Sequence, residues 1–242
     1  MAESFDIIII GAGIAGASVA AELSGTASVA ILEMESAPGY HTTGRSAAMF
    51  VPSYGPPVFR ALTRASEAFF RAPPDGFSGT PVMLPRGELL LAGPGDEALV
   101  EDARAMGLSD ISLDDAKRLI PPLKTQVLTA ALLDARAEDL DVDVLHQGFL
   151  KSFRHNAGKV ICDAEADSLT YQAGCWRVET RQGRFNAPVV VNAAGAWADV
   201  IARRAGVDVI GIQPKRRSAD AADISQFQLE TLPSAFVTSM YR

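Results

Sequence analysis

The sequence predicts an α/β fold that opens with a parallel βαβ unit. Phe5–Ile10 is rich in β-branched residues, as in a strand that is buried on both faces. Small and apolar residues over Ile14–Leu23 favour a helix, and Ser28–Glu33 favours a second strand. A spacing of about thirty residues suits the crossover between two parallel strands.

A glycine-rich turn joins the first strand to the helix. Gly11, Gly13 and Gly16 have the spacing GxGxxG, which permits a tight turn, a close pyrophosphate and close packing of helix on strand. The amides at the helix N-terminus favour phosphate. Glu33 ends the second strand, where a carboxylate can accept hydrogen bonds from a ribose diol. The pattern predicts a Rossmann-like dinucleotide site, and Glu33 disfavours NADP, so NAD and FAD remain.

The segment after Glu33 favours FAD over NAD. Gly39–Phe50 (GYHTTGRSAAMF) follows where a plain NAD domain would continue at once with another helix and strand. Its hydroxyl and guanidinium groups could satisfy phosphate and ring heteroatoms, and its small residues would let a flat ring lie close. The candidate residues are Thr43, Arg45, Ser46, Ala47 and Ala48.

Further elements follow from apolar periodicity and from turn residues. Gly44–Phe50 is expected to begin a helix, and Asp220–Arg242 has no clear period and no strong strand. Helices are expected at Val58–Phe70, Asp96–Met106, Asp114–Leu119, Val142–Asn156 and Trp197–Ala205. Strands are expected at Gly87–Leu91, Lys159–Cys162, Ser168–Gln172, Trp176–Arg181, Arg184–Asn186 and Pro188–Asn192, of which three form a meander.

Composition excludes several classes of function. The net charge of -7 argues against binding to nucleic acid or to an anionic membrane surface. The apolar N-terminal run is interrupted by glycines and lacks a basic flank, and no apolar stretch has the length of a membrane span, so a cytoplasmic protein is expected. Cys162 and Cys175 fall in neighbouring strand segments and are expected to be buried thiols, with no metal site. His41, His146 and His155 are expected on the surface of loops or helices.

Over roughly Phe5–Ser218 the chain resembles the D-amino-acid oxidase-like (DAO) family of FAD-dependent oxidoreductases. The resemblance rests on DIIIIGAGIAGAS, ILE, GYHTTGRSAA, VVVNAAGAWA and QPKRRSA. ALTRASEAFF and DVLHQGFL are similar to the bacterial D-arginine dehydrogenase-like members. The resemblance to the DAO family implies a GR2-type FAD-binding domain from residues 1–49 and 142–212. Residues 50–141 and 213–242 would form an interleaved, incomplete α+β substrate domain.

The resemblance also implies which residues hold FAD. The Ala166 backbone would meet the adenine, and Ala194 and Gly195 would form a turn that passes the pyrophosphate. The full set is Gly11, Gly13, Ile14, Ala15, Gly16, Glu33, Thr43, Gly44, Arg45, Ser46, Ala47, Ala48, Ala166, Ala194, Gly195 and Trp197.

The implied substrate is a small, amino acid-like molecule. Family members move a hydride to the flavin from a carbon that bears an amine or a hydroxyl. Arg217 would bind the substrate carboxylate, Tyr54 would face the substrate from a mobile loop, and Glu88 would meet the cationic end of a basic D-amino acid. Met49 stands where this branch often has a histidine, which casts doubt on an identical specificity. The electron acceptor, oxygen or a quinone, is left open.

Family members continue beyond the last residue of this sequence with a second carboxylate-binding arginine and the rest of the substrate sheet. Here QPKRRSA is followed by DAADIS, so we expect a C-terminally truncated member. A shifted reading frame or a natural short variant would give the same ending. Two alternative functions stay open: a non-catalytic fragment that binds FAD or ADP, and a hydroxyacid or glycerol-3-phosphate-type FAD dehydrogenase.

Overall fold

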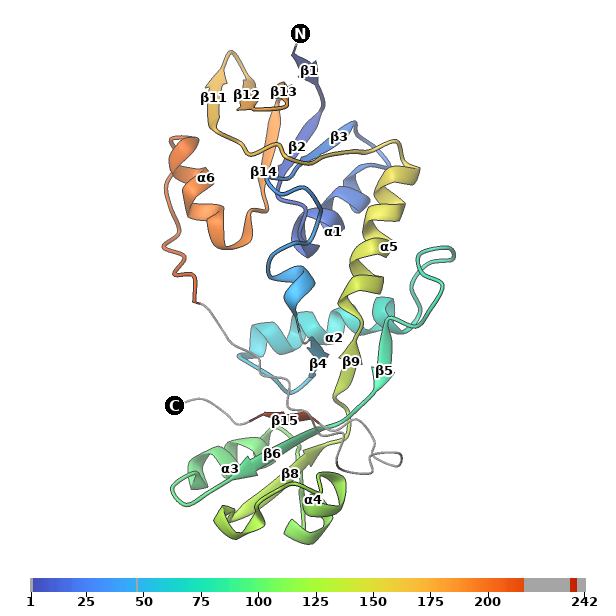
Figure 1. Cartoon of the computed structure of the whole chain (residues 1–242), viewed down its shortest axis with the longest axis vertical. Helices are drawn as coiled ribbons and strands as arrows, with labels where there is room; N and C mark the ends of the chain where they lie inside the picture. The colour runs from blue at the N-terminus through green and yellow to red at the C-terminus, as the bar shows by residue number, and fades with distance from the viewer. Residues whose placement is uncertain (1, 47, 216–235, 239–242) are drawn as a thin grey trace. The chain divides into compact units, whose positions relative to one another are not determined.

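The computed structural model describes residues 2–46, 48–215 and 236–238. The chain separates into two compact units. The first comprises Met1–Ala47, Pro74–Thr80 and Val142–Ser218. The second comprises Ala48–Pro73, Pro81–Asp141 and Ala219–Arg242. Helices alternate with parallel and antiparallel sheets (Figure 1), which confirms the predicted α/β class.

A four-stranded parallel sheet forms the centre of the first unit. Its order is β10 (Lys159–Ile161), β3 (Val29–Leu32), β2 (Ile7–Ile10) and β14 (Val189–Asn192). β2 therefore has a hydrogen-bonded neighbour on each side, and its register pairs Ile8 with Ala30 and Val190. Because parallel strands end at the same edge, the loops that follow β2, β3 and β14 meet there.

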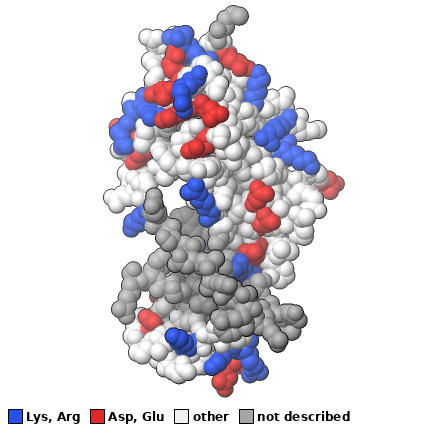
Figure 2. All heavy atoms as spheres, in the orientation of Figure 1, with Lys and Arg blue, Asp and Glu red and all other residues white. Residues whose placement is uncertain are grey.

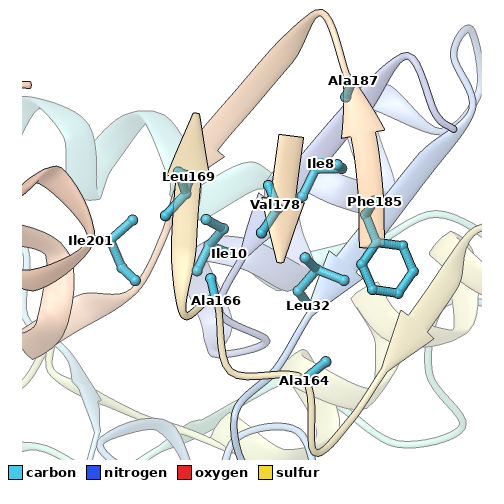
Figure 3. Packing of buried hydrophobic residues seen from close by; sticks show 10 residues of the cluster. All are labelled: Ile8, Ile10, Leu32, Ala164, Ala166, Leu169, Val178, Phe185, Ala187 and Ile201. Carbon is cyan, nitrogen blue, oxygen red and sulfur yellow. The ribbon is translucent and has the colours of Figure 1, made fainter. Parts of the chain in front are cut away.

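The isoleucines of β2 divide between two cores, which makes the first unit three layers thick. Ile9 packs on one face against α1 (Ile14–Leu23) and α5 (Val142–His155). Ile8 and Ile10 pack on the other face against a meander (Figure 3). Ile8 and Ile9 are fully buried, and each contributes roughly 1.5–3 kcal/mol to folding.

The meander covers the second face of the parallel sheet. Its side chains Leu169, Val178 and Phe185 join the cluster of Ile8 and Leu32 (Figure 3). Beyond β14 the chain forms the single turn η3 and then α6, which adds Ile201 to the same cluster. The elements are β11 (Ser168–Gln172), β12 (Cys175–Thr180), β13 (Gly183–Ala187), β1 (Glu3–Ser4, parallel to β13), η3 (Gly195–Trp197) and α6 (Ala198–Arg204).

The second unit contains two small sheets. In the larger one, Leu90 and Leu132 pack against α3, whereas Leu89 and Ala131 pack on the opposite face against α4. The larger sheet has the order β15 (Phe236–Thr238), β6 (Glu88–Ala92), β8 (Ala130–Asp134) and β7 (Ser109–Ile111), with α3 (Glu97–Ala105) and α4 (Leu113–Leu119). The smaller sheet has the order β4 (Met49–Phe50), β9 (Glu138–Leu140) and β5 (Met83–Pro85). The remaining elements are α2 (Pro57–Arg71), η1 (Thr43–Arg45, first unit) and η2 (Thr125–Val127).

Several predicted elements are wrong or missing. Gly44–Phe50 is no helix: after the single turn η1 the backbone becomes extended at Ser46 and enters β4. The strand β15 lies within Asp220–Arg242, where no strong strand was expected. The predictions also missed β1, β4, β5, β7, β8 and β9, which are short strands whose partners lie far away in the sequence.

The cysteines differ from the prediction. Cys162 follows β10 of the parallel sheet and Cys175 begins β12 of the meander, so they do not lie in neighbouring strands. Both are free thiols and only half-buried. Burial raises the pKa of the Cys162 thiol, and the charges of Glu33 and Asp163 add to the rise. Cys162 is therefore protonated and unreactive at neutral pH.

The described residues contain no membrane-spanning helix and no cluster of metal ligands. None of the helices there combines the length and apolar character that a membrane crossing requires. No group of three or more metal-ligating side chains comes together in the same part of the chain. On the face that Figure 2 shows, basic and acidic side chains are interspersed.

Candidate functional site

The turn between β2 and α1 can form only because its glycines lack side chains. Gly11 has φ 102°, and a Cβ atom there would lie 2.6 Å from the Ala193 carbonyl oxygen. A Cβ atom on Gly16 would lie 1.9 Å from the Gly11 carbonyl oxygen. Both obstacles are backbone atoms that cannot move aside, so strand and helix approach as closely as the GxGxxG spacing predicts.

Side chains from distant loops fix the amides of this turn. The Ala12 N–H donates to Glu33 Oε2 at 2.7 Å, and the Ile14 N–H donates to Thr43 Oγ1 at 2.9 Å. Within the described part of the chain, no protein group accepts a hydrogen bond from the amides of Gly13 and Ala15. These two amides stand at the positive end of the α1 dipole, so the turn can hold an anion.

Glu33 is 7% exposed at the end of β3. Its second oxygen, Oε1, accepts from the Glu35 N–H at 3.0 Å. Each carboxylate oxygen can accept two hydrogen bonds, so Glu33 can hold the backbone and still accept from hydroxyl groups. It lines a cavity, and a sugar diol is therefore a suitable partner.

The cavity has a volume of about 160 Å³ and lies where the loops after β2, β3 and β14 meet. Ala164 and Glu165 and the end of α6 complete its wall. The structure therefore brings together many of the predicted cofactor residues. Those that line the cavity are Gly11, Gly13, Glu33, Thr43, Ala166, Ala194, Gly195 and Trp197.

Other predicted cofactor residues build the neighbouring turn and do not line this cavity. The Gly44 N–H donates to the Gly39 carbonyl at 2.7 Å, and Ser46 Oγ donates to the Thr42 carbonyl at 2.7 Å. The Arg45 guanidinium lies 4.9 Å from the centre of the Tyr40 ring. Ala47 lies outside the described residues, and Ala48 belongs to the second unit.

A group of aromatic residues forms one wall of the cavity, and of its members the sequence predicted only Trp197 as a site residue. The His41 ring lies 4.5 Å from the Trp197 ring, and Tyr40 packs edge-on against His41 at 5.1 Å. His41 Nε2 also lies 2.8 Å from Glu35 Oε1. The expectation that His41 is a surface loop residue is thus only half right, because its ring is packed on both sides. The motif GYH alone gives no sign of a partner 156 residues away.

Arg204 and Asn192 hold two backbone segments of the cavity. Arg204 Nη1 donates to the Ala166 carbonyl at 2.7 Å, and Nη2 donates to Glu165 at 2.9 Å. Asn192 Nδ2 donates to the Ala198 carbonyl at 2.8 Å, and its Oδ1 accepts from the Ala194 N–H at 3.3 Å. The available signal for Asn192 was a polar residue at the end of the apolar run of β14. Arg204 gave no signal beyond its place in a last helical turn.

His146 contradicts the prediction that it lies on a helix surface. It is 3% exposed, and its Nε2 lies 2.9 Å from the Ala12 carbonyl oxygen in the glycine turn. The prediction was wrong because His146 lies on the face of α5 that packs on α1. The helical spacing of this face is that of apolar core residues, so a histidine there was not recognised as buried. His155, at the end of the same helix, is exposed as predicted.

The predicted substrate residues that the structure describes lie in the second unit. Tyr54 is 59% exposed and lines a cavity of about 330 Å³ together with Met49. The adjacent Ser53 donates to Asp134 Oδ2 at 2.7 Å. Asp134 in turn lies directly opposite Glu88 in the β6–β8 ladder. Ser53 therefore ties the loop that carries Tyr54 to β8, at the residue that lies opposite Glu88.

Asp134 is 1% exposed and fully hydrogen-bonded. Arg136 donates to it from its backbone N–H at 3.0 Å and from Nε at 2.8 Å. Burial acts to raise the pKa of the Asp134 carboxyl, but the hydrogen bonds from Arg136 and Ser53 outweigh it and hold the pKa below its ordinary value. Asp134 is thus ionised at neutral pH. Arg217, the predicted carboxylate-binding residue, lies outside the described residues.

The sequence matches the family model described as FAD dependent oxidoreductase (DAO) over residues 6–230. The chain belongs to this family. The family predicted from the sequence motifs is thereby confirmed, and FAD is its cofactor.

Solved structures of DAO-like proteins share the fold of this chain. Glycine oxidase from Geobacillus kaustophilus superposes with a TM-score of 0.75 at 22% identity, over 85% of this chain and 59% of that chain. L-proline dehydrogenase from P. horikoshii gives 0.71 at 21%, over 86% and 57%. FAD-bound L-alpha-glycerophosphate oxidase from Mycoplasma pneumoniae gives 0.73 at 18%, over 85% and 58%. The DAO chain described here thus spans less than two thirds of the length of each.

The residues of the first unit fit FAD. The Gly13 and Ala15 amides suit a pyrophosphate, and Glu33 suits a ribose. The aromatic and apolar wall around Trp197 suits a flat ring system. All of these groups border one cavity or the turn that forms its floor, so a DAO-type cofactor finds complementary chemistry within a single unit.

Proposed function

We propose that this DAO-family chain oxidises a D-amino acid or a related amine, as D-arginine dehydrogenase-like proteins do. The observation that carries the proposal is the glycine turn, which leaves amide donors at Gly13 and Ala15 beside the carboxylate of Glu33. A turn of this kind suits the pyrophosphate and ribose of a dinucleotide. The substrate class rests on the resemblance of ALTRASEAFF and DVLHQGFL to D-arginine dehydrogenase-like members.

We assign the first unit to the cofactor. Gly13, Ala15 and Gly16 would meet the pyrophosphate, Glu33 the ribose, and Ala166 the adenine. The domain division follows, with residues 1–49 and 142–212 as the FAD-binding domain and residues 50–141 and 213–242 as a partial substrate domain. The other assigned cofactor residues are Gly11, Ile14, Thr43, Gly44, Arg45, Ser46, Ala47, Ala48, Ala194, Gly195 and Trp197.

When bound, FAD supplies the acceptor for the hydride that leaves the substrate carbon bearing the amine. The residues of this chain then have to orient the substrate and keep its amine neutral, with little further acid–base chemistry. Arg217 would bind the substrate carboxylate through two parallel hydrogen bonds. Tyr54 and Glu88 would contact the rest of the substrate.

Glu88 is the residue that would select a basic amino acid. Glu88 is half-buried on β6. Its neighbour across the β6–β8 ladder, Asp134, forms an ion pair with Arg136. The Asp134 carboxylate therefore has its own cationic partner and does not compete with Glu88 for a cationic group of the substrate. A guanidinium or ammonium group would form a charge-assisted hydrogen bond with it.

The test is the visible absorption of the FAD-loaded chain under anaerobic conditions, with D-arginine, D-alanine, 2-hydroxyglutarate or glycerol 3-phosphate added. Bleaching by D-arginine supports the proposed oxidoreductase. Bleaching by 2-hydroxyglutarate or glycerol 3-phosphate alone would indicate the hydroxyl-oxidising alternative. A bound flavin that none of these compounds bleaches would indicate a fragment that binds FAD without turnover.

Two variants separate the substrate residues from the cofactor residues. Glu88→Gln is expected to weaken D-arginine binding by about tenfold while D-alanine is unaffected, because only D-arginine carries the distal charge. Glu101→Gln, at an exposed position on α3, is the matched control. Arg217→Ala is expected to weaken both amino acids with FAD still bound. Loss of FAD would assign Arg217 to the cofactor instead.

A further inference from the structure

The Ala12 peptide lies at the centre of the glycine turn, and both of its polar groups are bound by side chains. Its N–H donates to Glu33, and its carbonyl oxygen lies 2.9 Å from His146 Nε2. A carbonyl can only accept, so this hydrogen bond requires the tautomer of His146 that carries hydrogen on Nε2. Ala12 is fully buried, so its carbonyl has no access to bulk water.

The Ala12 carbonyl has one alternative partner close by in sequence. In a helix that began one residue earlier, it would accept a hydrogen bond from the Gly16 amide. The described structure contains no such bond, and the first bond at this end of α1 runs from the Ala17 N–H to the Gly13 carbonyl at 2.9 Å. The Ala12 carbonyl is therefore bound by the His146 side chain and not by an amide of the first turn of α1.

His146 also contacts the turn from Gly39 to Gly44. Gly39 is buried with φ 77°, and a Cβ atom there would lie 2.9 Å from His146 Cε1 and 3.1 Å from Nδ1. The Gly39 carbonyl accepts from Gly44, which closes the turn that presents Thr43 Oγ1 to the Ile14 amide. The His146 imidazole therefore contacts both the glycine turn, at Ala12, and the turn from Gly39 to Gly44, at Gly39.

Helix α5 supplies a rigid support for this side chain. His146, Leu150 and Phe153 follow the i, i+4, i+7 spacing of one helix face. Leu150 and Phe153 pack against Ala17 and Ala20 of α1 in a fully buried cluster. Packing against α1 therefore fixes the position of α5, which carries the imidazole. α1 is also the helix that follows the glycine turn.

We propose that His146 is a positioning residue for FAD, which holds the glycine turn in the conformation that binds pyrophosphate. Its side chain contacts the turn and is not among the residues that line the cavity. The inference holds whichever substrate the chain oxidises.

The test compares ligands with and without phosphate on the whole chain. His146→Leu keeps the side-chain bulk but removes the donor, and it is expected to weaken FAD and ADP by about ten- to a hundredfold. Adenosine, which lacks phosphate, is expected to bind within about twofold of the unaltered chain. His146→Gln keeps an N–H donor at the corresponding position and is expected to restore most of the affinity. His155→Leu, on the exposed end of α5, is the control.

Three results would overturn the proposal. They are unchanged FAD and ADP affinity in His146→Leu, an equal loss for ADP and adenosine, and failure of His146→Gln to restore affinity for ADP. If His146→Leu does not fold, two other measurements test the proposal. They are the ADP affinity of His146→Gln and the ¹⁵N resonances of His146 in the unaltered chain. An Nε2–H tautomer is expected, and an Nδ1–H tautomer would contradict the hydrogen bond to Ala12.

Discussion

The two units of the chain stabilise their loops and strands in different ways. In the first unit, buried parallel strands end in loops whose backbone groups are bound by side chains from far along the chain, such as Glu33, Thr43 and His146. In the second unit, charged side chains pair with one another across short strands, as Arg86 does with Asp139. The comparison indicates that the first unit is built to hold backbone amides in fixed directions, which a cofactor requires. The second unit combines apolar cores with pairs of charged side chains, such as Arg136 with the buried Asp134.

The strongest test of this contrast is Gly16→Ala. The added methyl carbon would lie 1.9 Å from the Gly11 carbonyl oxygen, so α1 has to move away from β2. We expect a loss of about 1–3 kcal/mol in the free energy of unfolding and loss of detectable FAD binding. Chemical denaturation and flavin fluorescence measure the two effects. Gly25→Ala is the control, because a Cβ atom there meets nothing within 4 Å.

Asp134→Ala is expected to affect the second unit alone. It removes the acceptor of Ser53 and Arg136, and a loss of about 1–3 kcal/mol in the free energy of unfolding follows. The loss stays at that level because Arg136 is 51% exposed and can turn toward water. Hydrogen exchange of the β6 and β8 amides should rise, while the affinity for FAD stays unchanged. A fall in FAD affinity would contradict the assignment of separate roles.

Arg204→Ala is expected to affect the first unit alone, and by less. The Ala166 carbonyl and Glu165 lose their donor, and we expect FAD binding to weaken by about five- to tenfold. Isothermal titration with FAD measures this change. Arg203→Ala, one residue away and exposed, should bind FAD as the unaltered chain does.

The smallest expected effect is a dependence of stability on pH in the second unit. Because the folded-state pKa of Asp134 is lowered, its contribution is present above the unfolded-state pKa near 3.8 and is lost as the pH falls through the folded-state value. The melting temperature should therefore fall more steeply with acid in the unaltered chain than in Asp134→Asn. Equal slopes below pH 4 would show that Asp134 contributes nothing through its charge.

The same contrast explains how much could be predicted from the sequence. Buried parallel strands appear as continuous apolar runs, so β2 and β3 and the helix Ile14–Leu23 between them were predicted nearly to the residue. β14 has a similar apolar run and was also predicted, although its residues are exposed or half-buried. The glycine spacing and Glu33 indicated a dinucleotide for the same reason, because their chemistry is local in sequence. Turns that require φ above zero leave a clear glycine signal.

The missed features depend on contacts between distant segments. β4 has two residues and β9 has three, and their pairing is decided by register with each other and with β5 rather than by apolar alternation. His146 occupies a helix position whose spacing is that of a core residue, and its partner Ala12 lies 134 residues earlier. A polar residue at an apolar position on a helix face was the one signal available, and it indicates a buried hydrogen bond.

The central claim is that the first unit binds FAD through the glycine turn. The most direct measurement is a titration of the whole chain with FAD, beside the variant Gly13→Val. A side chain at Gly13 would occupy the place of the pyrophosphate and lies 3.2 Å from Thr43 Oγ1 already at its Cβ atom. The account predicts one bound FAD with a flavin absorption spectrum for the unaltered chain and no binding for Gly13→Val. Equal retention of FAD by both proteins would contradict it.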